Sequence, residues 1–227
     1  MNYSLEHDFL KIAHRGASAY EPENTLRSFK VAIDMKADMI EFDVRMSKDG
    51  HLVVIHDNTV DRTTNGRGYV KELTLEELEN LDAGRGEKIP TLKEVIELGV
   101  GKTKFAIEIK EGGTEKKAIS LIKEYNLLED VFIISKNRDL LKNVKILEGD
   151  IRTCLIMVLS CTSIDSGRES LADAIAPFHF FITKRLVKKA QRSGLFLFTW
   201  IVDSKKRAQW MKDIGINGIV TNKPDII

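Results

Sequence analysis

Short apolar runs alternate with amphipathic stretches along most of the chain. The apolar runs predict strands near residues 10, 40, 106, 132, 155, 180, 198 and 219. Apolar residues at helical spacing predict helices from about Thr25, over 114–125, 138–147 and 184–192, near Ser170 and after Ser204. Strands that alternate with helices indicate a parallel sheet, and eight such repeats predict an α/β fold of the (β/α)₈ TIM-barrel type.

The second strand is predicted to continue into a hairpin. An apolar run over 39–44 precedes Asp49-Gly50, a dipeptide typical of two-residue hairpin turns, and a second apolar run follows it. Parallel neighbours cannot be joined by so short a turn, so the return arm should be antiparallel and lie outside the eight barrel strands. With Asp49-Gly50 as the turn, Asp43 lies opposite His56, with their Cβ atoms roughly 4.5–5.5 Å apart.

The segment between the second and third barrel strands is too long for an ordinary connection. It spans about 46–103 and contains two capping boxes, Thr74 to Glu77 and Thr91 to Glu94, each of which predicts the start of a short helix. We therefore expect one domain over 1–227, with a small inserted subdomain at about 46–103 above the mouth of the barrel.

Chemically active side chains occur where several predicted strands end. The first strand ends at His14 and Arg15, the second carries Glu41 and Asp43, the third carries Glu108 and Lys110, and the seventh ends at Trp200. Residues two apart on a strand point to the same face. Active sites of TIM barrels lie at the carboxyl ends of the strands, so these side chains are predicted to converge there.

Three of these residues are carboxylates that interrupt apolar runs. Glu41, Asp43 and Glu108 would be costly to bury without a compensating cation. Together they form an all-oxygen ligand set, which suits Mg²⁺, Ca²⁺ or Mn²⁺ better than zinc. The alternative interpretations are a solvated strand face for Glu41 and Asp43, and a surface ion pair between Glu108 and Lys110.

The basic residues of the same group suit a phosphate. Arg15 presents a fork to phosphate oxygens and Lys110 adds a point charge. His14 and His56 titrate near neutral pH and form a candidate general acid–base pair, although His14 is also a candidate metal ligand. A cation, two positive side chains and two imidazoles predict phosphoester cleavage.

Composition and charge limit the kinds of partner and the cellular location that are expected. The chain has 227 residues, 43% of them hydrophobic and 30% charged, and a formal net charge of +1, with no long basic block, so nucleic-acid binding has little support. No apolar run has the length of a membrane span, and Met1 to Lys11 lacks the apolar core of a signal peptide. Cys154 and Cys161 form no CxxC motif, which favours reduced thiols and a cytoplasmic protein. No role is predicted for the remaining histidines, which are His7, His51 and His179.

Many short motifs of this chain resemble the glycerophosphodiester phosphodiesterase family. The matching stretches are His14-Arg-Gly16, Glu23-Asn-Thr25, Glu41-Phe-Asp-Val44, Lys48-Asp-Gly50, Val54-Ile-His-Asp57, Arg62-Thr-Thr-Asn-Gly66, Ile89-Pro-Thr-Leu92, Glu108-Ile-Lys110, Trp200-Ile-Val-Asp203 and Gly215-Ile-Asn-Gly-Ile-Val-Thr221. They cover nearly the whole chain, and the first half is the more specific.

The resemblance implies an enzyme that cleaves glycerophosphodiesters to sn-glycerol 3-phosphate and an alcohol such as choline or ethanolamine. It implies a divalent cation at Glu41, Asp43 and Glu108. It also implies that His14 and His56 act as acid and base, and that Arg15 and Lys110 hold the phosphate. In the mechanism usually proposed for such enzymes, a glycerol hydroxyl attacks phosphorus and water opens the cyclic intermediate.

Two stretches depart from the family pattern. Ser135-Lys136 stands where the family often has Ser-Phe, and Trp200-Ile-Val-Asp203 stands where it has Trp-Thr-Val-Asn. Both departures affect the pocket for the alcohol and the shape of the mouth. Trp200 is expected either to pack against the glycerol or to serve as a packing residue of the barrel rim.

Two alternative functions remain open. A lysophospholipase D-type phosphodiesterase needs an apolar surface beside the mouth, for which Phe178, Phe180 and Phe181 are candidates, although strand geometry favours core packing for them. A barrel that binds phosphodiesters without cleaving them is the other alternative. The sequence leaves the head group, the native metal and the oligomeric state open.

Overall fold

Eight parallel strands close into a barrel, as predicted. The structure, a computed structural model, describes residues 9–158 and 164–226. The barrel strands are β1 (Leu10–His14), β2 (Met39–Met46), β4 (Lys104–Ile109), β5 (Val131–Ser135), β6 (Arg152–Met157), β7 (Ala174–Pro177), β8 (Phe196–Thr199) and β9 (Gly218–Thr221). They pair in this order, and β1 pairs with both β9 and β2, which closes the sheet on itself. His7, Cys161 and most of the N-terminal stretch judged against a signal peptide lie outside the described residues.

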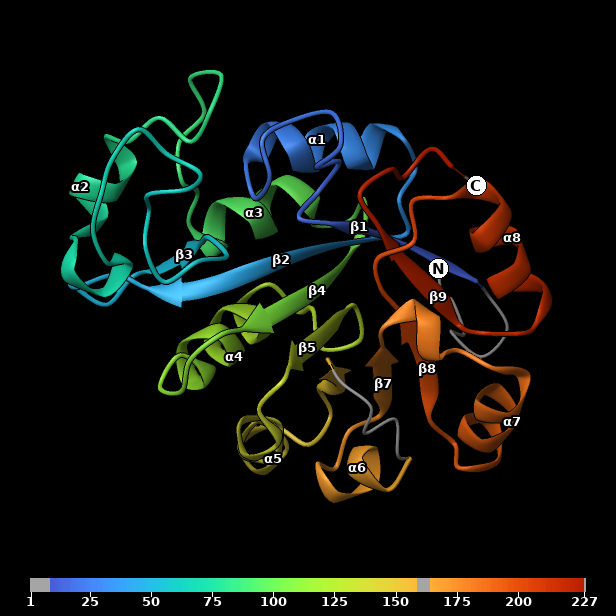
Figure 1. The fold of residues 1–227 in the computed structure, drawn as a ribbon. Helices are drawn as coiled ribbons and strands as arrows, with labels where there is room; N and C mark the ends of the chain where they lie inside the picture. Colours follow the sequence, from blue (N-terminus) through green and yellow to red (C-terminus); the bar gives the residue numbers. More distant parts are fainter. Residues whose placement is uncertain (1–8, 159–163, 227) are drawn as a thin grey trace.

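Helices surround the strands (Figure 1). They are α1 (Leu26–Asp34), α3 (Leu92–Gly99), α4 (Glu115–Glu124), α5 (Arg138–Leu147), α6 (Ile164–Glu169), α7 (Lys184–Arg192) and α8 (Lys205–Asp213). Several begin at a side-chain cap: Thr25 accepts a hydrogen bond from the amide of Ser28, and Ser204 accepts one from the amide of Arg207. Both predicted capping boxes are present. Outward strand side chains pack against these helices, and inward ones such as Met39, Phe132 and Phe198 form a smaller cluster inside the barrel.

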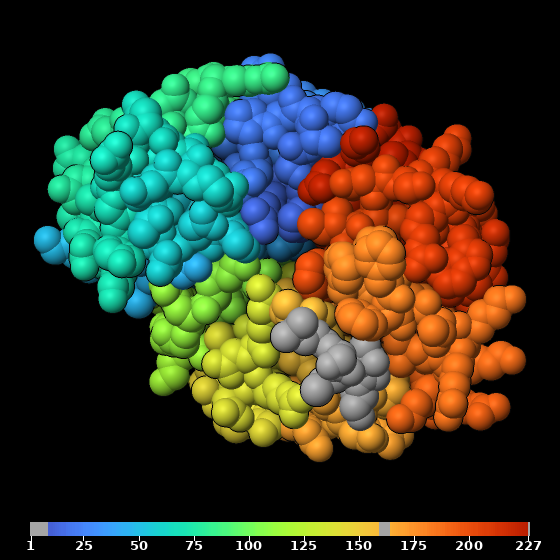
Figure 2. All heavy atoms as spheres, in the orientation of Figure 1, coloured from blue at the N-terminus to red at the C-terminus, as the bar shows by residue number. Residues whose placement is uncertain are grey.

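The chain after β2 forms an extension beside the barrel. It contains β3 (Leu52–Val54), the 3₁₀ turn η1 (Val70–Glu72) and α2 (Leu75–Glu79). Its buried residues form a hydrophobic cluster separate from the barrel core, namely Val53, Ile55, Val60, Val70, Leu78, Ala83 and Ile89. Figure 2 shows the extension (cyan to green) as a lobe next to the N-terminal segment (blue) and away from the C-terminal one (orange to red). Within the span 46–103, α3 packs against α1 in the helix ring, so the boundaries of an inserted subdomain stay a prediction.

The return arm of the hairpin, β3, is antiparallel and lies outside the barrel, as predicted. The register of the hairpin differs from the predicted one. Val44 pairs with Val54, and the amide of Ser47 donates to the carbonyl of His51, which leaves three residues in the turn. Gly50 closes this turn at φ +86°, a backbone angle that glycine adopts without strain. Asp43 therefore faces Ile55, whose amide donates to its carbonyl over 2.9 Å, and the prediction that Asp43 lies opposite His56 is wrong.

The seventh strand is also displaced from its predicted place near residue 180. It is the short buried run Ala174–Pro177, whereas His179–Phe181 forms a 3₁₀ turn, η2. The aromatic side chains after the strand made it look longer and later than it is. Phe180 is 73% exposed and Phe181 39% exposed, so the expectation that these side chains pack in the core is wrong for both.

Candidate active site

Three buried carboxylates meet at the carboxyl ends of β2 and β4. Asp43 pairs with Glu108 in the parallel register of these strands, and Glu41 lies two residues earlier on the same face of β2. An oxygen atom from each of Glu41, Asp43 and Glu108 lies within 4.8 Å of the others. All three side chains are buried, so their mutual repulsion is weakly screened.

Two basic side chains neutralise part of this charge. Lys110 Nζ lies 2.7 Å from Asp43 Oδ1 and 2.7 Å from Glu108 Oε1. Arg15 Nε lies 3.2 Å from Asp43 Oδ2, and the backbone amide of Arg15 donates to Glu41 Oε2 over 3.0 Å. Among the described residues, no Lys or Arg side chain forms an ion pair with Glu41.

The titration behaviour of the carboxylates follows from these partners. Burial raises the pKa of Glu41 well above its ordinary value, and the neighbouring charges of Asp43 and Glu108 raise it further. Burial and Asp43 also raise the pKa of Glu108, against the opposing effect of Lys110. Burial acts in the same direction on Asp43, but Lys110 and Arg15 outweigh it and lower the pKa of that carboxyl to about 2.

The donor set fits a hard divalent cation. Three carboxylates within one small volume supply oxygen ligands, and a cation there would relieve the repulsion that raises the pKa of Glu41. Asn24 adds an orphaned buried atom to the same cluster. Its Nδ2 donates to Asp43 Oδ2 over 2.9 Å, whereas its Oδ1 has no hydrogen-bond partner among the described residues.

His14 is held by an amide at the end of the last strand. Its Nδ1 lies 2.7 Å from Asn222 Oδ1, and Asn222 is anchored by two hydrogen bonds to the carboxylate of Asp203. Since Asn222 Nδ2 donates to Asp203, its Oδ1 must accept, which assigns the proton of neutral His14 to Nδ1 and leaves Nε2 as a base. Burial, assisted by Arg15, lowers the pKa of His14 and so favours this neutral form.

His56 is held by a carboxylate instead. Its Nδ1 lies 2.6 Å from Asp57 Oδ1, and Arg62 Nε donates to the other oxygen of Asp57 over 2.6 Å. Burial lowers the pKa of His56, whereas Asp43 and Asp57 oppose this effect by favouring the charged ring. Arg62 also bonds Glu23, which receives a hydrogen bond from Arg15 over 2.8 Å, so a chain of charges joins the extension to the carboxylate cluster.

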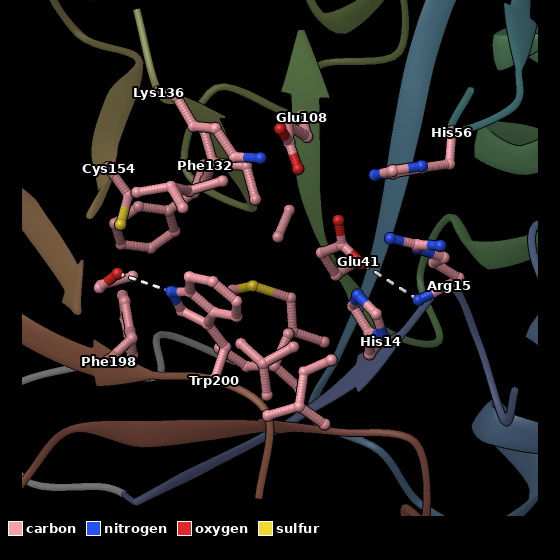
Figure 3. Close-up of a pocket in the computed structure, with 18 residues that line it drawn as sticks. His14, Arg15, Glu41, His56, Glu108, Phe132, Lys136, Cys154, Phe198 and Trp200 are labelled. Carbon is pink, nitrogen blue, oxygen red and sulfur yellow. Dashed lines mark hydrogen bonds between the residues drawn. The ribbon is translucent and has the colours of Figure 1, made fainter. Parts of the chain in front are cut away.

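A cavity of about 190 Å³, the interior cavity, lies between these groups and the inside of the barrel. Figure 3 shows His14, Arg15, Glu41 and His56 together at one side, and Phe132, Cys154, Phe198 and Trp200 at the other. Lys136 reaches in from the rim near Glu108. Trp200 Nε1 donates to the carbonyl of Ala176 over 2.8 Å, so the indole is held as a wall of this cavity.

The structure thus brings all eight predicted site residues to one end of the barrel. Six of them line the interior cavity, namely His14, Arg15, Glu41, His56, Glu108 and Trp200, and the other two, Asp43 and Lys110, contact members of this set. His56 reaches the cavity despite the shifted register, because β3 ends at Val54 and the chain bends before His56. Their catalytic and binding roles stay predictions.

Several residues that organise the site received no role from the sequence. They are Ser18, Glu23, Asn24, Asp57, Arg62, Asp203 and Asn222. Most lie in loops after strands, where pairing over long sequence distances cannot be deduced from periodicity. A usable signal existed for Asp57, which directly follows His56, and for Asn222, which directly follows the last strand.

Comparison with known proteins agrees with this geometry. Residues 14–226 match the model of the glycerophosphoryl diester phosphodiesterase family. The chain belongs to this family. It is therefore a phosphoric diester hydrolase, and its barrel fold is the one found in solved structures of the family.

Relatives match over nearly their full length. A glycerophosphodiester phosphodiesterase of Caldanaerobacter subterraneus subsp. tengcongensis is 45% identical over 96% of this chain and 96% of its own length. A glycerophosphodiester phosphodiesterase structure from Agrobacterium tumefaciens is 28% identical, with a TM-score of 0.87 over 96% of this chain and 98% of its own. An Oleispira antarctica phosphodiesterase in complex with the product sn-glycerol-3-phosphate is 26% identical, with a TM-score of 0.85 over 95% of this chain and 94% of its own.

No helix in the described part of the chain has the length and apolar character needed to cross a bilayer. The cytoplasmic location stays a prediction.

Proposed function

We propose that this protein hydrolyses glycerophosphodiesters to sn-glycerol 3-phosphate and a free alcohol, with a divalent cation at Glu41, Asp43 and Glu108. The observation that carries the proposal is the buried carboxylate cluster beside two imidazoles and the basic side chains of Arg15 and Lys110. The Oleispira antarctica relative bound to sn-glycerol-3-phosphate supports this product. The cation supplies positive charge to the phosphoryl oxygens, with Mg²⁺, Ca²⁺ and Mn²⁺ as candidates.

The two imidazoles divide the proton transfers. In the first stage, His14 Nε2 takes the proton from a glycerol hydroxyl as its oxygen bonds to phosphorus, and His56 Nε2 gives a proton to the departing alcohol oxygen. In the second stage, the roles reverse: His56 takes a proton from water, which bonds to phosphorus, and His14 returns a proton to the glycerol oxygen. Burial favours neutral His14, whose Nδ1 proton Asn222 holds, whereas Asp57 favours protonated His56, which matches the order of the two stages.

The basic side chains hold the phosphate during both stages. Arg15 and Lys110 flank the carboxylate cluster and carry positive charge toward the phosphoryl oxygens. Burial works against the charged forms, but Asp43 and the neighbouring acids raise the pKa of both side chains, so they stay charged near neutral pH.

The test is release of sn-glycerol 3-phosphate from glycerophosphocholine by purified protein, with and without excess chelator. We expect activity that chelation abolishes and that Mg²⁺, Mn²⁺ or Ca²⁺ restores. His14→Ala and His56→Ala should each lower kcat by about 10²–10⁴-fold. Full activity in chelator would remove the cation from the proposal, and near-normal turnover in either variant would remove that histidine. Substrate binding without product, across all three cations, would identify a non-catalytic barrel.

One observation favours lysophospholipids as a second class of substrate. Phe180 and Phe181 are exposed, and Phe178 packs on Trp200 with ring centroids 5.3 Å apart, so an aromatic surface adjoins the wall of the interior cavity. Such a surface suits contact with an acyl chain. Activity on lysophosphatidylcholine above that on glycerophosphocholine, lost in Phe180→Ser, would support this substrate; the reverse preference would oppose it.

A further inference from the structure

A second cleft opens beside the candidate active site. This side cleft, of about 380 Å³, lies between the extension and the ends of β4 and β5, and is lined among others by Arg45, Asn58, Ser135 and Asn137. It shares only His56, Glu108 and Lys136 with the interior cavity. Glu108 is therefore flanked by two different spaces, the interior cavity with many apolar side chains and the side cleft with mainly polar ones.

The position of His56 indicates which part of the substrate enters which space. This step rests on the proposed function, in which His56 protonates the departing alcohol oxygen. His56 borders both spaces, whereas His14 and Trp200 border only the interior cavity. The glycerol, which His14 deprotonates, then occupies the interior cavity, and the alcohol leaves through the side cleft.

One positive side chain of the side cleft has no ion-pair partner among the described residues, whereas the carboxylates Asp57 and Glu108, which also line the cleft, are paired. Arg45 donates hydrogen bonds to the carbonyl of His56 and to Glu111. Lys110 forms ion pairs with Asp43 and Glu108. Lys136 is exposed and forms no hydrogen bond or ion pair within the part of the chain that the structure describes. It continues the inward face of Phe132 and Ile134 by one step, and its amine lies near Glu108 (Figure 3). Lys136 lines both spaces.

Neutral donors and acceptors complete the cleft. Asn137 accepts two backbone hydrogen bonds through Oδ1 at the start of α5, which leaves its Nδ2 available as a donor. Asn58 is exposed, with a side-chain amide that can bind hydroxyl groups. An aromatic ring at position 136 would attract an ammonium group through its face, whereas a lysine repels it.

We propose that the side cleft is the subsite for the leaving alcohol and that Lys136 makes it select alcohols with hydroxyl groups or negative charge over those with an ammonium group. The residue acts on binding of the head group and takes no part in the proton transfers. We therefore expect Lys136 to change the ratio of kcat/KM values between substrates with different head groups.

The experiment compares three glycerophosphodiesters whose alcohols differ in charge: glycerophosphocholine, glycerophosphoglycerol and glycerophosphoinositol 4-phosphate. Wild-type protein should prefer the last two. Lys136→Met should reduce the preference for the anionic over the cationic substrate by about tenfold, mainly through KM, and Lys136→Glu should reverse it. Lys188→Met, at an exposed lysine of α7, is the matched control and should leave all three kcat/KM values unchanged.

The outcomes separate this proposal from the proposed function. Hydrolysis of none of the three substrates by wild-type protein, with any of the three cations, would overturn the function itself. Hydrolysis with an unchanged ratio in both Lys136 variants would overturn the subsite and leave the function standing. An equal loss on all three substrates would place Lys136 on the shared phosphate and equally contradict the proposal. Thermal unfolding midpoints close to wild type confirm that the variants are folded.

Discussion

At the scale of single residues, the two imidazoles differ chiefly in what holds them. Burial lowers the pKa of both His14 and His56, but a neutral amide orients the first and a carboxylate the second. An amide oxygen selects a tautomer without adding charge, whereas a carboxylate also stabilises the imidazolium. These partners support the proposed roles of His14 as base and His56 as acid in the first stage.

Exchanging the partner of His14 tests this assignment. Asn222→Asp places a carboxylate against Nδ1 and raises the pKa of His14, so the base stays protonated to higher pH. The acidic limb of kcat/KM should move upward by about one pH unit, equivalent to roughly 1.4 kcal/mol. A pH–rate profile on glycerophosphocholine measures it. Asp57→Asn is the counterpart: it lowers the pKa of His56 and should move the basic limb downward. Limbs that stay in place in both variants would contradict the assignment.

The carboxylate cluster makes a second prediction, which needs no activity measurement. Glu41→Gln removes one of three repelling charges and keeps an acceptor for the amide of Arg15. In chelator, the variant should unfold at a higher temperature than wild type. Excess Mg²⁺ or Mn²⁺, at about 100 times Kd, should raise the wild-type midpoint by roughly 5–10 °C, since binding then contributes about 2.7 kcal/mol. The variant should lose most of this rise in scanning fluorimetry, and an equal rise in both would exclude Glu41 as a ligand.

At the scale of elements, the turn after β1 carries the backbone amide that bonds Glu41. Gly16 in this turn has φ +81°, and a Cβ there would lie 2.2 Å from Ser28 Oγ and 2.8 Å from the carbonyl oxygen of Ser28. Only glycine meets both demands, the backbone angle and the close approach of α1. The glycine of the motif His14-Arg-Gly16 is therefore required by the geometry of this turn.

Gly16→Ala is expected to destabilise the protein by about 2–4 kcal/mol and to reduce turnover, because the turn must shift away from α1. Gly101→Ala is the matched control: it has a similar angle, φ +73°, and a Cβ at this position would meet no other atom within 4 Å. The control measures angle strain alone, at about 1 kcal/mol. Denaturant unfolding of both variants gives the difference, and equal losses would show that contact with Ser28 adds nothing.

Helices and strands could be predicted from the sequence where a local signal, such as a cap or an apolar run, sets their bounds. They were predicted less well where contacts distant in sequence set them. The helices after Thr25, Asn137 and Ser204 begin at local caps, and β4 spans the predicted apolar run. β7 was placed too late in the sequence because its four buried residues carry a weaker signal than the aromatic run that follows them. The hairpin register failed because Gly50 serves a three-residue turn as readily as a two-residue one.

At the scale of the whole molecule, the extension completes a site that the barrel starts. Glu41, Asp43 and Glu108 could be grouped from strand ends, because parallel strands finish at one rim. The network from His56 through Asp57 and Arg62 to Glu23 could not be predicted from the sequence. It joins two loops whose contact depends on how the extension packs against the barrel. Catalysis is therefore expected to depend on this docking as well as on the barrel.

Arg62→Met tests that dependence. The arginine is about half exposed, so its ion pairs should contribute at most about 1 kcal/mol to stability. Its loss leaves the charge of Asp57 less neutralised, which raises the pKa of His56 and should move the basic limb of kcat/KM upward, while weaker positioning lowers kcat by about tenfold. Arg67→Met, in the same loop and without a side-chain partner among the described residues, should match wild type. Identical pH profiles and turnover in the two variants would show that the extension contributes no more than packing.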